Sequence, residues 1–181
     1  MKRLQALSPF FAANSAVVEL GSVMTVNAQV TIRQAQSSDM KAVVDLIDFV
    51  LKKEFPTDQA AYTPADIEKL METYAPPRSI FLVAVDGNQI VGTCGVKADQ
   101  ASTAILRRLF VSAPYRCKGI GSHLLKESIG FCRSHNFREI VIRTSTKMEK
   151  AIRLCQSLGF KEDGRWEMGE TTLIQFCLRL A

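Results

Sequence analysis

The chain has 181 residues and a formal net charge of +5, and 47% of its residues are hydrophobic and 23% are charged. These values are typical of one globular domain with a sizeable core. No apolar run approaches the ~20 residues of a membrane-spanning helix, and nucleic-acid binding usually needs denser Lys and Arg clusters.

The first 29 residues differ from the rest of the chain. They are short of acids, and Lys2 and Arg3 precede apolar residues as in a targeting peptide. Polar residues and a proline interrupt that apolar stretch, however, and no clear cleavage site follows. We expect residues 1–29 to be an N-terminal extension, flexible or docked, with Met24 as an alternative start. Residues 30–181 would form the domain.

Two helices are predicted after the strand-like run VTIR. Ser38 is a suitable N-cap, and apolar residues then recur at helical spacing until Pro56 ends the helix. A second helix is expected from Thr63, with Pro64 at its first position. The apolar face of the first helix comprises Met40, Val43, Val44, Ile47, Val50 and Leu51.

The middle of the chain predicts three strands and a helix. Two apolar runs flank Asp86–Gly87–Asn88, which is typical of a β-hairpin. TAILRRLFV predicts the third strand. In the helix that follows, Asn136 is suited to the left-handed position at the C-terminal end. The apolar face of this helix comprises Ile120, Leu124, Leu125, Ile129 and Cys132.

The last part of the chain predicts a buried strand (EIVIRT), a helix and two final strands. Thr146 and Glu149 are spaced as a capping box for the helix, and Gly159 ends it. The final strands lie near Lys161–Met168 and Thr171–Leu180. The predicted order is β-α-α-β-β-β-α-β-α-β-β. It describes one mixed α/β (α+β) domain whose central sheet has about six or seven strands, with an antiparallel meander leading into a parallel β-α-β step.

The stretch PYRCKGIGSHLL links the strand TAILRRLFV to the next helix. A helix N-terminus presents unpaired N–H groups and partial positive charge. Gly119 and Gly121 let the backbone approach a ligand, and Arg116 and Lys118 add full charges. We interpret this loop as a cradle for phosphate or pyrophosphate.

Other glycine-rich motifs fit this loop less well. The P-loop spacing and its Gly-Lys-Ser/Thr ending are absent. A dinucleotide fingerprint needs a third glycine where Leu124 stands, and the following strand is not succeeded by an acidic residue. A glycine-bearing turn without a ligand is the remaining alternative.

Three features in the same order resemble the GNAT superfamily of acyl-CoA N-acyltransferases. They are the pattern [R/Q]xxGx[G/A] at residues 116–121 after RRLFV, the downstream AIRLCQSLGF, and the order of elements over residues 30–181. The resemblance implies an acyl-CoA N-acyltransferase-like fold. It also implies acetyl-CoA as co-substrate, held in a V-shaped gap between the fourth and fifth strands.

The resemblance also implies which residues bind acetyl-CoA. The loop amides would hold the pyrophosphate, assisted by the side chains of Arg116 and Lys118. Main-chain groups of Leu109 and Val111 would bind the pantetheine arm as an added strand does, and an amide of this strand could stabilise the oxyanion. The loop residues so assigned are Arg116, Cys117, Lys118, Gly119, Ile120, Gly121 and Ser122.

Cys155 stands where relatives carry a tyrosine general acid. A thiol can donate a proton, but it is shorter than a phenol. Three roles stay open for Cys155: proton donation to the leaving CoA thiolate, a covalent acetyl-cysteine intermediate, or packing as a small apolar residue on the apolar face of its helix. In the last case water protonates the thiolate, or CoA leaves as the thiolate.

The general base is not identified by the sequence either. Ile105 stands where many relatives carry a glutamate. Acids near the expected acceptor region are more simply read as surface charges, Tyr62, Tyr74 and Tyr115 as packing or surface residues, and His123 as a polar neighbour of the loop. The acids concerned are Glu54, Asp58, Glu68, Glu167 and Glu170.

We predict an N-acetyltransferase that moves an acetyl group from acetyl-CoA to a primary amine of a small molecule or protein, by direct attack in a ternary complex. An acetyl-CoA-binding module with little or no catalysis is the alternative, and acetylation of an RNA-bound amino acid is a third. Five unclustered cysteines and only two histidines argue for a reducing, cytoplasmic location and against a metal site. Monomer and homodimer both stay open.

Overall fold

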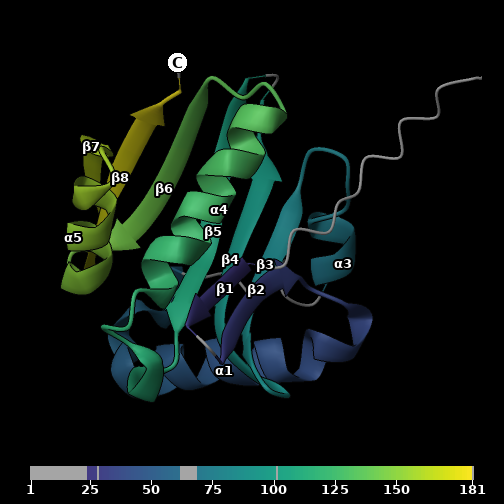
Figure 1. Cartoon of the computed structure of the whole chain (residues 1–181). Coiled ribbons are helices and arrows are strands. Elements are labelled where there is room, and N and C mark those ends of the chain that lie inside the picture. Colours follow the sequence, from purple (N-terminus) through teal and green to yellow (C-terminus); the bar gives the residue numbers. More distant parts are fainter. Residues whose placement is uncertain (1–23, 28, 62–68, 101, 181) are drawn as a thin grey trace, which may run out of the picture.

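The computed structural model describes residues 24–27, 29–61, 69–100 and 102–180 (Figure 1). The strands are β1 (Met24–Asn27), β2 (Val30–Gln34), β3 (Ile80–Asp86), β4 (Gln89–Ala98), β5 (Thr103–Val111), β6 (Glu139–Ser145), β7 (Lys161–Met168) and β8 (Thr171–Arg179). The helices are α1 (Met40–Glu54), α3 (Leu70–Thr73), α4 (Ile120–Ser134) and α5 (Glu149–Ser157). Short 3-10 helices are η1 (Ser37–Asp39), η2 (Pro56–Ala61) and η3 (Ala113–Tyr115).

The strands form one mixed sheet of eight in the order β1-β2-β3-β4-β5-β6-β8-β7. The predicted antiparallel meander is confirmed from β2 to β5. The strands β5 and β6, which α4 connects along the chain, pair in parallel. The sheet exceeds the predicted six or seven strands because Met24–Asn27 pairs with β2 as an edge strand. This part of the expected N-terminal extension is therefore docked.

Both faces of the sheet are covered, as the alternation along β3 shows. Leu82 and Ala84 belong to one core, which α4 and α5 complete, whereas Phe81 and Val83 belong to a second core with α1 and α3. Figure 1 shows α4 across one face of the sheet, and α1 packs in the core on the other face. A central strand buried on both faces explains why this stretch of the sequence is continuously apolar. In the part of the chain described, no helix is both long and apolar enough to cross a membrane.

Most predicted boundaries are confirmed. Asp86 and Gln89 close the β3–β4 hairpin, Asn136 has a φ of 59° just after α4, and Gly159 has a φ of 87° just after α5. All five predicted apolar residues of α4 are buried. The second predicted helix begins among residues outside the described ranges, so its start at Thr63 stays a prediction.

Both predicted helix caps are wrong. Ser38 lies inside η1, and the carboxylate of Asp39 instead accepts the backbone N–H of Gln36 at 2.8 Å. At α5 the N-cap position is Met148, and no side chain caps it. The spacing of polar residues suggested caps at both helices. In the structure a 3-10 turn precedes α1, and before α5 the Ser145 hydroxyl accepts the Lys147 N–H at 3.1 Å.

A bulge in β5 opens the sheet. Thr93 pairs with Phe110 and Gly95 with Arg107, so two residues of β5 face one residue of β4. Arg108 has a φ of 58°, and its carbonyl accepts a hydrogen bond from the Thr93 hydroxyl at 2.8 Å. A bulge bends its strand. Registered pairing of β5 with β6 ends at Leu106–Ile142, although both strands continue.

Candidate active site

A cavity of about 690 Å³ lies at the diverging ends of β5 and β6. Its walls come from the end of α1, residues 109–111 of β5, the loop into α4 and the first turn of α4. Lys147 and Met148, together with residues of α5, complete the wall. The strands diverge where a V-shaped gap is expected from the resemblance, between the fourth and fifth strands of the predicted domain. The bulge in β5 that helps to open this gap was not predicted from the sequence.

The cavity brings together most of the residues assigned to acetyl-CoA from the sequence. They are Leu109, Val111, Arg116, Cys117, Gly119, Ile120, Gly121 and Ser122. Lys118 is not among the lining residues. Its ammonium lies 5.2 Å from the centre of the Tyr115 ring, beside a second, smaller hollow.

The two glycines of the loop lie in different environments. Gly119 has a φ of 82°, a left-handed conformation that glycine adopts without strain, and α4 begins at the next residue. A Cβ on Gly121 would lie 3.4 Å from Leu154 and 3.7 Å from Val111, both of which line the cavity. The first turn of α4 therefore presents its N–H groups to the cavity with little side-chain cover.

Arg116 connects three elements around the cavity. Its Nε donates to the Val111 carbonyl at 2.8 Å, and its two terminal nitrogens donate to the Glu54 carboxylate at 2.5 and 2.7 Å. This bidentate pair ties the loop to the end of α1. From the sequence, the Arg116 side chain is expected to assist in binding the pyrophosphate. In the structure, its guanidinium is held by Val111 and Glu54.

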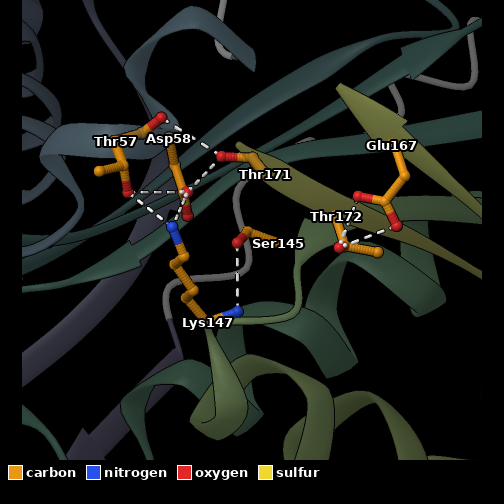
Figure 2. Close-up of polar contacts among 7 residues, drawn as sticks. All are labelled: Thr57, Asp58, Ser145, Lys147, Glu167, Thr171 and Thr172. Atoms are coloured by element: carbon orange, nitrogen blue, oxygen red, sulfur yellow. Dashed lines mark hydrogen bonds and ion pairs between the residues drawn. The ribbon is translucent and has the colours of Figure 1, made fainter. Parts of the chain in front are cut away.

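The chain just after α1 makes a second connection, to the opposite arm of the gap. Asp58 of η2 accepts a hydrogen bond from the Thr171 hydroxyl at 2.8 Å and lies 3.6 Å from the Lys147 ammonium. The same ammonium donates to the Thr57 hydroxyl at 2.8 Å. Figure 2 shows the Lys147 side chain extending from the segment after β6 toward Thr57 and Asp58. Residues 54–58 thus contact both arms of the gap.

The five candidate acids occupy different places. Glu54 lines the cavity, and Asp58 is fully buried behind Lys147. Glu167 accepts a hydrogen bond from the Thr172 hydroxyl at 2.9 Å, away from Lys147 in Figure 2, and Glu170 is exposed in the turn between β7 and β8. Glu68 lies outside the described residues. Of the described candidates, only Glu54 lines the cavity.

Cys155 lies in the core. Its exposure is 0%, it packs in the cluster beneath α4, and it is not one of the residues that line the cavity. Burial raises the pKa of its thiol to about 12. The helical spacing that placed Cys155 on an apolar face therefore agrees with its position.

The remaining polar candidates are engaged in local contacts. His123 Nδ1 lies 2.9 Å from the Gly119 carbonyl, and the Tyr115 hydroxyl donates to Asp86 at 2.8 Å. Tyr74 is buried with its ring edge toward Phe81. Tyr62 is outside the described residues. The described side chains, His123, Tyr115 and Tyr74, therefore act in packing and in local polar contacts, as expected.

Curated relatives resemble the chain over about half of their length or less. It is 32% identical over 112 residues to "Probable N-acetyltransferase 14" of Xenopus tropicalis, a match that covers 61% of this chain and 54% of the relative. It is 35% identical over 101 residues to "N-acetylaspartate synthetase" of Rattus norvegicus, covering 55% and 33% respectively.

The fold is shared with solved structures. An acetyltransferase of the GNAT family from Staphylococcus aureus Mu50 superimposes with a TM-score of 0.73 at 24% identity, over 84% of this chain and 99% of the other. The family model described as "Acetyltransferase (GNAT) family" matches residues 44–160, which include β5, the glycine loop, α4 and α5. Members of this family use acetyl-CoA as co-substrate. The chain therefore belongs to the GNAT acetyltransferase family.

Proposed function

We propose that this protein transfers the acetyl group of acetyl-CoA to a primary amine of a small molecule or protein, by direct attack in a ternary complex. The observation that carries the proposal is the cavity at the divergence of β5 and β6, which is lined by the glycine loop and the first turn of α4. It combines the end of β5, beyond its registered pairing with β6, with the first turn of a helix. A long ligand with a polar arm and a pyrophosphate requires such a combination.

The loop would bind the pyrophosphate mainly through main-chain N–H groups. Those at the start of α4 are the groups that the helix itself leaves unpaired. Arg116 would act chiefly by holding the loop against Glu54 and Val111. The β5 backbone at Leu109 and Val111, beyond the end of its pairing with β6, would bind the pantetheine arm.

Proton transfers accompany the reaction. An amine with a pKa near 10.4 is neutral in only about one part in 10³ at pH 7, so the acceptor must lose a proton before it attacks the thioester carbon. The C–S bond of the tetrahedral intermediate then breaks while the nitrogen gives up a further proton to become the amide, and the sulfur leaves as the thiolate or takes a proton from water. An N–H group of the β5 backbone would stabilise the tetrahedral oxyanion.

Cys155, in our proposal, packs in the core and does not protonate the thiolate. A thiol whose pKa is raised to about 12 by burial is a poor proton donor at neutral pH. Cys155 also does not line the cavity in which the thioester would lie. Water therefore protonates the leaving sulfur, or CoA departs as the thiolate.

An acetyl-CoA-binding module with weak catalysis is the second candidate. It is favoured by the buried Cys155 at the position of the family's tyrosine and by Ile105 at the position of its glutamate. An acceptor screen separates the two functions: the purified chain is incubated with acetyl-CoA and a panel of amines, and CoA thiol release is followed. Amine-dependent release supports the transferase, whereas tight acetyl-CoA binding without turnover on any amine supports the module.

We also propose a cytoplasmic location, because the cysteines at 94, 117, 132, 155 and 177 are all free thiols. Whether the protein acts as a monomer or a homodimer stays open, and gel filtration with light scattering distinguishes the two.

A further inference from the structure

Asp58 is the centre of a polar cluster that also contains Thr57, Lys147 and Thr171. Asp58 is 0% exposed, and one of its carboxylate oxygens is buried without a hydrogen-bond partner in the structure. The other oxygen accepts from Thr171 and lies near the Thr57 hydroxyl, at 3.4 Å, and the Lys147 ammonium. A buried carboxylate is costly unless a cation or donors compensate it. Asp58 therefore fixes the position of Lys147.

Lys147 lines the cavity while its ammonium contacts Asp58 and Thr57. Its side chain is 45% exposed and lines the cavity, and its nitrogen donates to Thr57 from one side. An ammonium carries three N–H donors. Among the described residues, Thr57 is the one hydrogen-bond partner of the Lys147 ammonium and Asp58 lies at ion-pair distance, so the ammonium has donor capacity left for a ligand.

The charges along the cavity wall favour an anion near Lys147 and Lys150. The two lining carboxylates, Glu54 and Glu149, each pair with an arginine, Arg116 and Arg153. Lys150 also lines the cavity, just after Lys147 in the chain. Counting Lys147 and Lys150 against Asp58 leaves one positive charge, which matches a single carboxylate.

The two arms of the gap separate this anion from the pyrophosphate. The glycine loop follows β5, whereas Lys147 follows β6 two residues after Ser145. Lys147 thus lines the cavity from the β6 arm and is not part of the glycine loop. Figure 2 shows the Asp58 carboxylate between the Lys147 ammonium and the Thr171 hydroxyl.

We propose that Lys147 binds a carboxylate of the amine acceptor, so that the preferred substrates are amines that carry a carboxylate, such as amino acids. Asp58 is a positioning residue that holds Lys147 in place. This inference rests on the acetyltransferase function proposed above. It assigns the acceptor class, about which the glycine loop carries no information.

The test compares matched acceptors. L-alanine, L-aspartate and L-phenylalanine are each assayed beside the corresponding α-carboxamide, and kcat/KM is measured from CoA release. An amino acid and its amide differ in amine basicity, but this difference cancels when the ratio of their kcat/KM values is compared between variants. The wild-type chain is expected to use at least one of the amino acids in preference to its amide.

The decisive variant removes both charges together. Lys147→Met alone leaves Asp58 buried and unpaired, so Asp58→Asn/Lys147→Met is the safer substitution, with its fold checked by circular dichroism and thermal melting. We expect it to lose about 10- to 100-fold in the ratio of amino acid to amide, as for a lost charged hydrogen bond, through KM for the acceptor. Lys147→Arg should retain most of the preference.

The control is Lys41→Met, which breaks another lysine–aspartate pair, with Asp45, on the exposed surface of α1. It should leave the ratio unchanged. An equal loss in the control, an unchanged ratio in the double variant, or turnover of carboxylate-free amines only would overturn the inference while leaving the acetyltransferase intact. A raised KM for acetyl-CoA in the double variant would assign Lys147 to CoA instead. Absence of turnover with every amine would overturn both proposals.

Discussion

Glu54 at the end of α1 and Arg116 in the loop before α4 form a bidentate ion pair across the mouth of the cavity, with N–O distances of 2.5 and 2.7 Å. Both side chains are about a quarter exposed. Because Arg116 also binds the Val111 carbonyl, the pair fixes the end of β5, the glycine loop and α1 relative to one another. The loop thereby has its shape before acetyl-CoA arrives.

Breaking this pair is expected to weaken acetyl-CoA binding. Arg116→Ala and Glu54→Gln should each raise the Kd for acetyl-CoA by about 5- to 50-fold, because the loop amides lose their fixed orientation. Calorimetric titration measures the effect. If the two residues act as one pair, the double variant should lose little more than the worse single variant. An unchanged Kd in Arg116→Ala would rule out the proposed cradle.

The same variants test whether Glu54 is the general base. A positional role predicts that kcat of Glu54→Gln at saturating acetyl-CoA stays within about tenfold of wild type and that its pH profile keeps its shape. Loss of the acidic limb of the profile, with acetyl-CoA affinity intact, would instead assign proton removal to Glu54.

Gly121 offers a size test of the cavity. Gly121→Ala adds a Cβ at ordinary contact distance from Leu154 and Val111 and should bind acetyl-CoA nearly as well as wild type. Gly121→Leu extends a larger side chain toward the same residues and should raise the Kd more than about tenfold. Thermal melting serves as the folding control. Equal affinity in both variants would place acetyl-CoA away from this part of the loop.

Cys155→Ala is expected to change stability more than chemistry. The thiol is fully buried, so its removal leaves a small void that should lower the melting temperature. The rate at saturating substrates should stay within a few-fold of wild type. A loss of 10²-fold or more in kcat, with intact acetyl-CoA binding, would establish Cys155 as a proton donor or nucleophile.

Asp39 makes the stability of the domain depend on acid pH. The Arg33 guanidinium donates to both Asp39 oxygens, at 2.6 and 2.9 Å, and these hydrogen bonds hold the pKa of the carboxyl below its ordinary value. A lowered folded-state pKa contributes stability in full above the unfolded pKa of about 3.9, and this contribution disappears as pH falls through the lowered value.

Urea unfolding of wild type and Asp39→Asn between pH 2 and 7 measures this contribution. The variant should be less stable near pH 7 by about 1–3 kcal/mol, and the difference should shrink below about pH 4. A difference that stays constant over this range would show that the Asp39 charge does not contribute.

Local patterns were sufficient to predict the elements that surround the site. A continuous apolar run identified β3, helical spacing identified α1 and α4, and glycine and asparagine identified the turns, because these signals lie in short stretches of the sequence. The edge strand β1 was missed because it is short and its partner, β2, supplies its stability. The helix caps were wrong because Asp39 and Ser145 make contacts that spacing does not reveal.

The site divides in the same way. The loop from Arg116 to Ser122 is contiguous in sequence, so its role could be predicted from a short motif. The contacts of Thr57 with Lys147 and of Asp58 with Thr171 join residues 90 and 113 positions apart, and the bulge at Arg108 depends on pairing with β4. Such features follow from tertiary contacts, and no local pattern encodes them.

The central claim is acetyl transfer from acetyl-CoA to an amine, and the most direct measurement detects the product itself. The chain is incubated with acetyl-CoA carrying a ¹³C-labelled acetyl group and the amine panel, and labelled N-acetyl products are identified by mass spectrometry, with Gly121→Leu as the matched control. We predict labelled amide that depends on both acceptor and enzyme and falls sharply in the control. Binding of acetyl-CoA without labelled product from any amine would contradict the claim.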